Sequence, residues 1–271
     1  MKKKLIQKEY DKKIKLIQRY NKGYYDENNS EISDADYDLL KKEIIEFEKK
    51  YNFLNKSNSP IGQVGYKPSK NFKKVLHRVP MLSLGNAFTE NDLVNFEKKI
   101  KNFLSLDESS SISYTAEPKI DGISASLTYI NGEFSKGLSR GDGKEGEDIT
   151  SNLLTVKDIP KFINSKNFPK EIDIRGEVFI QNSDFQKLKD KFANPRNAAS
   201  GSLRQKDPEQ TKNIPLKFIA YTFGYEKGLK VNNQSDFLRK LTEWGFKTNP
   251  LNILNSGVKN LMKNYQEIEK K

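Results

Sequence analysis

Apolar side chains recur every three or four residues along the first fifty positions of the chain, which is the spacing of an amphipathic helix. Between residues 5 and 24 they fall at Ile6, Tyr10, Ile14, Ile17, Tyr20 and Tyr24. A second stripe follows at Tyr37, Leu40, Ile44, Phe47 and Tyr51. Ser33, with Asp36 three residues later, is typical of the start of that second helix. The pattern predicts a helical hairpin over residues 1 to about 55.

A change of composition after this hairpin indicates a domain boundary. Residues 55–70 combine Ser, Asn and Gly with Pro60 and Pro68, which is the composition of a linker or an extended loop. We therefore predict two domains, a helical one at residues 1–58 and a larger one at residues 59–271.

Beyond the linker the pattern predicts one more helix and then changes to strands. A helix beginning at Thr89 would bury the stripe Leu93, Phe96, Ile100 and Phe103. Apolar and polar residues alternate over 123–129, and Asn131-Gly132 predicts a hairpin turn into the next strand. Further strands are expected at 172–180 and 216–225. Hairpin-connected strands interrupted by helices favour an α+β fold with mainly antiparallel sheets and flanking helices.

Composition narrows the chemistry that the chain can perform. There is no Cys and a single His, His77, which excludes disulfides, iron–sulfur clusters, thiolate zinc sites and His-based triads. The sequence has neither a long apolar run nor a signal-peptide pattern, so we expect a cytoplasmic protein. The 48 Lys and Arg against 36 Asp and Glu leave a net charge of +12. This charge suits nucleic acid or a phosphorylated ligand, although a lysine-rich solvated surface explains the same excess.

Lys119 is the strongest candidate nucleophile. It lies in Glu117-Pro118-Lys119-Ile120-Asp121-Gly122, between two strand-like runs, where a short loop can present it from a rigid sheet. A lysine attacks only after its ammonium loses a proton, which requires desolvation or neighbouring cations, and a carboxylate can orient it. Glu117 and Asp121 are placed for that role. The alternative is a lysine at the edge of a hairpin without a catalytic role.

A glycine-rich segment at residues 139–146 contains the G-x-G-x-x-G spacing of dinucleotide-binding folds. No βαβ unit surrounds it, so we reject a Rossmann crevice. The loop and Arg140 remain a plausible phosphate cradle, through backbone amides and a guanidinium group. A solvent-exposed turn is the alternative interpretation.

Two further segments combine charge with small residues. In the strand Asp173–Phe179, Gly176 permits a close approach to the backbone, and Glu177 is positioned to accept a ribose hydroxyl. In residues 194–204, Arg196 and Arg204 flank small residues that allow close contact with phosphates. An ordinary Gly-Ser loop is the alternative there.

The order and spacing of these segments closely resemble the adenylation core of bacterial NAD-dependent DNA ligases. The matching motifs are Glu-Pro-Lys-Ile-Asp-Gly (117–122), Ser-Arg-Gly-Asp-Gly-Lys-Glu-Gly-Glu-Asp-Ile-Thr (139–150), Arg-Gly-Glu-Val-Phe (175–179) and Asn-Pro-Arg-Asn-Ala-Ala-Ser-Gly-Ser-Leu-Arg (194–204). The resemblance extends to Tyr24-Tyr25, Asp34-Ala35-Asp36-Tyr37-Asp38 and the segment Met81–Phe88, so it covers nearly the whole chain.

The resemblance implies a role for each matching residue. Lys119 would attack the α-phosphate of NAD, release nicotinamide mononucleotide and carry AMP for transfer to a 5′-phosphate at a DNA nick, in replication and repair. The adenosine half of NAD would be bound by Ser83, Leu84, Glu117, Asp121, Gly122, Arg140 and Glu177. The nicotinamide half would be bound by Tyr24, Tyr25, Asp34, Ala35, Asp36, Tyr37 and Asp38. Arg196 and Arg204 would contact DNA or nucleotide phosphates. Mg²⁺ or Mn²⁺ would assist, no protein-bound metal and no zinc is expected, and the chain would act as a monomer on nicked double-stranded DNA.

The chain also departs from the family pattern. After Trp244-Gly245 the family has an Asp-Gly-x-Val-x-Lys strand and a later lysine that touch the nucleotide, and both are missing here. We expect a truncated ligase whose isolated adenylation is slow or absent. Asn28 and Ser30 replace residues common in the family. Two alternatives remain: a noncatalytic fragment that binds NAD, nicotinamide mononucleotide or DNA, and an ATP-dependent ligase or RNA-capping relative, which the tyrosine-rich hairpin disfavours.

Overall fold

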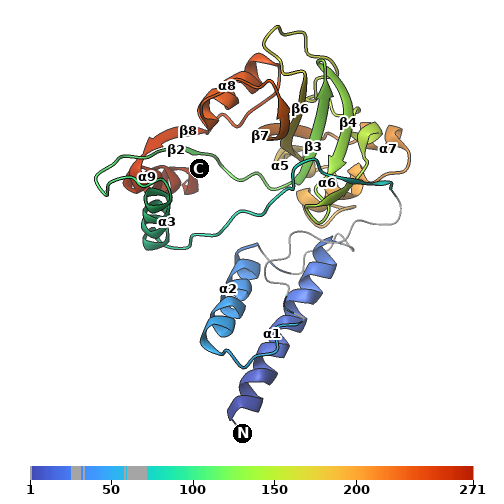
Figure 1. Cartoon of the computed structure of the whole chain (residues 1–271). Coiled ribbons are helices and arrows are strands. Elements are labelled where there is room, and N and C mark those ends of the chain that lie inside the picture. Colours follow the sequence, from blue (N-terminus) through green and yellow to red (C-terminus); the bar gives the residue numbers. More distant parts are fainter. Residues whose placement is uncertain (1, 26–31, 33, 58, 60–71, 271) are drawn as a thin grey trace.

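The N-terminal helices form an antiparallel pair with a core of their own (Figure 1). The computed structural model describes residues 2–25, 32, 34–57, 59 and 72–270. Helices α1 (Lys2–Tyr25) and α2 (Asp34–Lys50) bury the predicted stripes against each other, with Tyr10, Ile17 and Ile44 almost fully enclosed. The predicted hairpin is therefore confirmed. Its proposed capping residue, Ser33, lies outside the described residues, and the domain boundary at 58/59 stays a prediction.

A four-stranded antiparallel sheet in the order β4-β3-β6-β7 is the centre of the larger part of the chain. Its strands are β3 (Ile123–Ile130), β4 (Glu133–Ser139), β6 (Glu171–Phe179) and β7 (Lys217–Lys227). Asn131 and Gly132 adopt positive φ angles of 50° and 82° in the predicted β3–β4 turn. Strand β6 is buried along nearly its whole length, because both of its faces are covered. The α+β class is confirmed.

Short helices and aromatic side chains complete the core around this sheet. The helices are α4 (Thr150–Leu153), α5 (Asn182–Phe185), α6 (Pro195–Leu203), α7 (Pro208–Lys212) and α8 (Gln234–Glu243). Phe218 from β7 packs in one cluster with Phe237 and Trp244, together with Leu127 and Ile174. Burial of this aromatic and aliphatic surface is the main stabilising contribution to the sheet.

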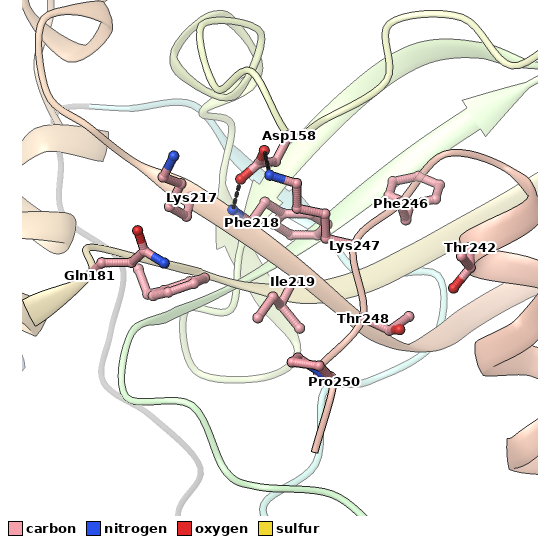
Figure 2. A pocket seen from close by; sticks show the side chains of 11 residues that line it. Asp158, Gln181, Lys217, Phe218, Ile219, Thr242, Phe246, Lys247, Thr248 and Pro250 are labelled. Carbon is pink, nitrogen blue, oxygen red and sulfur yellow. Dashed lines mark hydrogen bonds and ion pairs between the residues drawn. The ribbon is translucent and has the colours of Figure 1, made fainter. Parts of the chain in front are cut away.

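On both outer strands of the sheet, backbone amides donate hydrogen bonds to groups outside the sheet. On β4, the amide of Gly137 donates to Thr150 Oγ1 at 2.9 Å, and the Gly137 carbonyl accepts from Ile149 N at 2.9 Å. On β7, Phe218 N donates to the Asp158 carboxylate at 3.3 Å. Next along β7, Ala220 N donates to the carbonyl of Lys247 at 2.9 Å. A cavity of about 470 Å³ lies beside this edge, and Figure 2 shows the ion pair between Asp158 and Lys247 on its wall.

Two smaller sheets flank the central one. Strand β1 (Lys74–Leu76) pairs with β5 (Glu145–Glu147), and β2 (Ser113–Ala116) pairs with β8 (Ile253–Ser256), both antiparallel. Helices α3 (Glu90–Phe103) and α9 (Gly257–Glu269) pack on each other, and α9 also packs on β2 and β8. No described helix has the length and apolar character to cross a membrane.

Helix α3 begins where the sequence predicts, but its stripe is not buried. Thr89 is the N-cap and forms a capping box with Asp92. No residue of the helix is buried, and Phe103 is 87% exposed. The prediction of a buried stripe is therefore wrong, because α3 packs mainly on the single helix α9. Its link to the two-stranded sheet is a hydrogen bond from the Tyr114 hydroxyl to Glu97.

Candidate active site

Lys119 lies on the loop that connects β2 to β3, and its side chain is exposed. Gly122 determines how closely this loop approaches the sheet. A Cβ at Gly122 would overlap the Val178 carbonyl and would lie 2.9 Å from Glu177 Cγ. Only glycine therefore allows the loop to lie directly on β6. The spacing Lys-x-Asp-Gly consequently brings the lysine close to the buried carboxyl of Glu177.

Glu177 is the buried acid of the site, with 8% of its surface exposed. Ser124 Oγ donates a 2.8 Å hydrogen bond to Glu177 Oε2 across the β3–β6 ladder. Burial raises the pKa of Glu177 to about 7, while Ser124 and the nearby cations Arg196 and Lys119 oppose the rise. The carboxyl and the Lys119 ammonium therefore lie within electrostatic range of each other.

Glu117 is the second acid of the site, and it is partly buried. Burial raises its pKa, and the Gln234 amide opposes this by donating a 2.8 Å hydrogen bond to Glu117 Oε1. The same Nε2 of Gln234 also donates to the Tyr221 carbonyl at 2.7 Å. Burial and the neighbouring Glu177 raise the pKa of the Tyr221 phenol to about 12. Gln234 thus links the loop before Lys119 to strand β7.

Arg140 follows the last residue of β4, and hydrogen bonds hold both its guanidinium group and its main-chain carbonyl. Its Nη2 donates to Ser83 Oγ at 3.0 Å, and its carbonyl lies 3.1 Å from His77 Nε2. The Arg140 Nε is buried and has no hydrogen-bond partner among the described residues. Gly141 has a φ of 57° in the turn that follows. The glycine-rich segment thus joins β4 of the central antiparallel sheet to β5 of the two-stranded sheet, which is not the context of a Rossmann crevice.

The two arginines of residues 194–204 are both paired with carboxylates. Arg196, near the N-terminus of α6, forms a 3.0 Å ion pair with Asp121 of the lysine loop. Arg204 follows α6 and forms a 3.0 Å ion pair with Glu147, whose side chain is fully buried. Arg196 is therefore beside the candidate nucleophile, whereas Arg204 is anchored at a buried carboxylate.

The residues assigned to the nicotinamide half lie on the helical hairpin. Tyr24 and Tyr25 end α1, Asp34 and Ala35 begin α2, and the side chains of these four lie outside the described residues. Asp36 is exposed and Asp38 is half-buried. The Tyr37 hydroxyl donates to Asn21 at 2.7 Å within the hairpin. Leu84, assigned to the adenosine half, is 77% exposed.

Sequence reasoning missed four residues that shape the site, namely His77, Ser124, Tyr221 and Gln234. Ser124 and Tyr221 lie within predicted strands, but strand alternation alone does not distinguish a site residue from its neighbours. Gln234 reaches Glu117 across 117 positions of sequence, so no local signal exists for that contact. Among the described residues no group of three or more His, Cys, Asp or Glu could hold a metal ion.

The antiparallel fold and the lysine loop packed on it define an adenylation domain of the nucleotidyltransferase class. Two protein-family models match the chain and identify the class more narrowly. Residues 69–271 match the family model of the NAD-dependent DNA ligase adenylation domain. Residues 3–65 match that of the DNA ligase-like, N-terminal NAD⁺-binding domain. The chain belongs to the NAD-dependent DNA ligase family, and the resemblance found in the sequence is confirmed.

Curated relatives agree with this assignment. The chain is 66% identical over 263 residues to a DNA ligase of Pelagibacter ubique, covering 97% of this chain and 39% of the relative. It is 43% identical to DNA ligases of Parvibaculum lavamentivorans and Geotalea uraniireducens. Those matches cover 94% and 95% of this chain but 37% and 39% of the relatives. The chain thus spans about two fifths of the length of these relatives.

Proposed function

We propose that this chain carries out the first chemical step of an NAD-dependent DNA ligase. Lys119 Nζ attacks the α-phosphorus of NAD, a phosphorus–nitrogen bond forms, and the bond to nicotinamide mononucleotide breaks. The observation that carries the proposal is the packing of Gly122 on β6, which brings Lys119 to Glu177. Lys119 itself is exposed, so an incoming nucleotide can reach it.

The surrounding charges fit a transfer of this kind. Phosphoryl transfer depends mainly on positioning and on electrostatic stabilisation of the phosphate oxygens. We assign this role to Arg140 and Arg196, since the Arg140 guanidinium lies beside Ser83 and Arg196 forms an ion pair with Asp121 of the lysine loop. Glu117 and Glu177 would bind the adenosine, and Asp121, Gly122, Ser83 and Leu84 would complete that side. Mg²⁺ would bind chiefly through the phosphates of NAD, because such ions use substrate phosphates and few carboxylates.

The remaining roles rest on the family. The hairpin residues Tyr24, Tyr25, Asp34, Ala35, Asp36, Tyr37 and Asp38 would bind the nicotinamide half of NAD. AMP would then pass to the 5′-phosphate of nicked DNA, with Arg196 and Arg204 as phosphate contacts. These later steps belong to a longer ligase that acts in the cytoplasm.

Intact-mass spectrometry after incubation with NAD and Mg²⁺ tests the first step. Because the downstream lysines of the family are missing from this chain, we expect the adduct to form slowly. After a long incubation the wild type should carry one added AMP, and Lys119→Ala should carry none. The matched control is Lys136→Ala, which removes an exposed lysine from β4 and should keep the adduct. ATP in place of NAD should give no adduct, whereas an adduct from ATP alone would favour the ATP-dependent class. A wild type that binds NAD by calorimetry but gains no AMP would overturn the catalytic proposal in favour of a binding fragment.

A further inference from the structure

A segment preceding α3 is paired along the glycine-rich turn next to Arg140. We call residues 74–84 the strap. Its first part, β1, pairs with β5, and the pairing then continues through two further backbone hydrogen bonds. His77 N donates to the Lys144 carbonyl at 2.8 Å, and Met81 N donates to the Gly143 carbonyl at 2.8 Å. Met81 is only 4% exposed, so the strap is anchored at this point.

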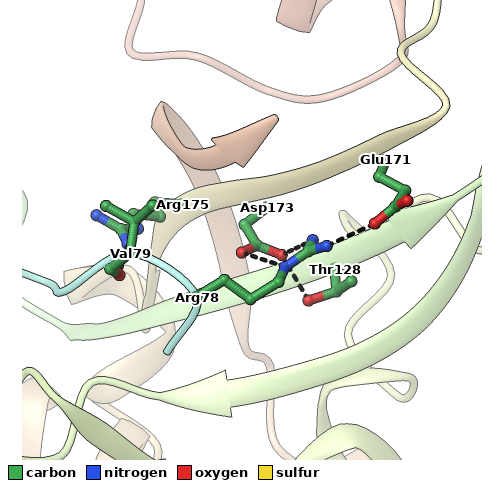
Figure 3. Close-up of polar contacts among 6 residues, drawn as sticks. All are labelled: Arg78, Val79, Thr128, Glu171, Asp173 and Arg175. Atoms are coloured by element: carbon green, nitrogen blue, oxygen red, sulfur yellow. Dashed lines mark hydrogen bonds and ion pairs between the residues drawn. The ribbon is translucent and has the colours of Figure 1, made fainter. Parts of the chain in front are cut away.

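Arg78 joins the strap to the central sheet. Its Nε donates to Asp173 Oδ2 at 3.1 Å, and its Nη1 donates to Glu171 Oε2 at 2.8 Å (Figure 3). Arg78 Nη2 donates to Asp173 Oδ1 at 2.5 Å, and the Thr128 hydroxyl donates to the same oxygen at 2.7 Å. The guanidinium lies 4.1 Å from the ring centroid of Tyr225. A planar guanidinium satisfies all these partners at once, which a lysine could not do.

Arg175 on β6 holds the next two residues of the strap by their backbone. Its Nη1 donates to the Pro80 carbonyl at 3.2 Å, and its Nη2 donates to the Val79 carbonyl. The side chain lies directly over Gly224, where an added Cβ would be 2.6 Å from Nη2. Burial lowers the pKa of Arg175, and the nearby Asp173 opposes this. A mostly buried arginine is therefore used to bind main-chain carbonyls of the strap.

The strap holds Arg140 at two points. Ser83 accepts a hydrogen bond from the guanidinium, and His77 Nε2 contacts the main-chain carbonyl of Arg140. Because a carbonyl only accepts, the His77 ring must carry its proton on Nε2. Burial lowers the pKa of His77, so the neutral ring is the form present near neutral pH. The contact needs only this neutral form.

We propose that His77 and Arg175 are positioning residues for Arg140, acting through the strap. Arg175 fixes the strap on the sheet, and His77 and Ser83 then fix the backbone and the guanidinium of Arg140. Neither His77 nor Arg175 is required to touch the nucleotide. The inference rests on the proposed function, since Arg140 matters only if a phosphorylated ligand binds beside it.

The decisive comparison is His77→Gln against His77→Leu, measured by single-turnover adenylation at varied NAD concentrations. Glutamine retains an N–H donor in place of Nε2, whereas leucine does not. We expect His77→Leu to raise the half-saturating NAD concentration roughly threefold to tenfold, which corresponds to one lost hydrogen bond, with a much smaller change in the maximal rate. His77→Gln should stay close to the wild type. Equal values for both variants would overturn the role of His77.

Hydrogen exchange measured by mass spectrometry supplies an arm that needs no catalysis. In His77→Leu and in Arg175→Lys, amides of residues 138–148 should exchange faster, while amides of β3 should not change. Exchange in 138–148 equal to that of the wild type would overturn the proposal even if adenylation fails in every sample. Faster exchange without any adduct on the wild type would support the positioning role and reject the proposed activity. Should Arg175→Lys not fold, the His77 pair still gives the answer.

Discussion

Arg204 Nε lies 3.0 Å from Oε2 of Glu147, and the Glu147 side chain has no exposed surface. Removing one member of an ion pair with a buried carboxylate is more costly than removing one member of an exposed pair. We expect Arg204→Gln to lower the free energy of unfolding by roughly 2–4 kcal/mol, measured by urea denaturation.

The matched control is Arg239→Gln, whose exposed pair with Asp236 lies within one helix. It should change stability by less than about 0.5 kcal/mol. Wild-type stability in Arg204→Gln would show that the pair with Glu147 is dispensable. Loss of DNA binding in an Arg204 variant is informative only alongside this stability measurement.

The raised pKa of Glu177 predicts a pH dependence of stability. The folded chain holds the proton up to about pH 7, whereas an unfolded glutamate releases it near its ordinary value of 4.5. Stability from this group is therefore greatest below about pH 4.5 and falls as the pH rises through 7. Glu177→Gln removes the dependence and keeps an acceptor for Ser124. Relative to the wild type it should gain roughly 1–3 kcal/mol between pH 4.5 and pH 8.

Urea denaturation at the two pH values, followed by the fluorescence of Trp244, measures this gain. Trp244 is the single tryptophan of the chain and lies in the core around the central sheet. Glu133→Gln, at an exposed position on β4, is the control and should show no such gain. A constant difference between Glu177→Gln and the wild type across this pH range would refute the assignment.

Gly176 illustrates how tightly β6 packs against β7. A Cβ there would overlap Phe218 Cζ and the Ile219 carbonyl. Gly176→Ala should lower the free energy of unfolding by about 3 kcal/mol, since Phe218 is fully buried in the core and the Ile219 carbonyl belongs to the backbone of β7. Gly85→Ala is the control, because no atom lies within 4 Å of the added carbon. Differential scanning calorimetry separates the two, and equal melting temperatures would contradict the packing described.

The separate core of the hairpin predicts a local effect of Ile44→Ala. Ile44 is fully buried between α1 and α2, so its truncation should cost about 2–5 kcal/mol within the hairpin. Far-UV circular dichroism should then show helix loss at lower urea, while the fluorescence transition of Trp244 stays in place. Leu39→Ala, at a residue 55% exposed on the same helix, should leave both transitions unchanged. A shift of the Trp244 transition would mean that the two cores unfold together.

Sequence periodicity predicted the hairpin and the strands because each depends on local spacing. The Asn131-Gly132 turn followed from the φ angles that its residues tolerate. The stripe on α3 failed because periodicity reports which face is apolar and not what covers it. Phe103 has the helical spacing and is nevertheless 87% exposed.

The candidate site was predictable where its residues share a motif and not where distant segments meet. Lys119 and Gly122 were found because they are close in sequence. The role of Arg175 was missed because its contacts with Val79 and Pro80 cross 95 or more positions. A basic side chain inside a strand gives no indication that it binds a strap passing over the sheet.

The occupied edges of the central sheet bear on how the protein behaves at high concentration. An outer strand with unpaired amides is a template on which a strand of another molecule can add, and repeated addition leads to aggregation. Asp158 takes the amide of Phe218, Lys247 takes that of Ala220, and Thr150 takes that of Gly137 on the opposite edge. These donors are therefore not offered to a neighbouring molecule. The Asp158 carboxylate at one edge and the Thr150 hydroxyl at the other thus oppose the addition of strands from other molecules.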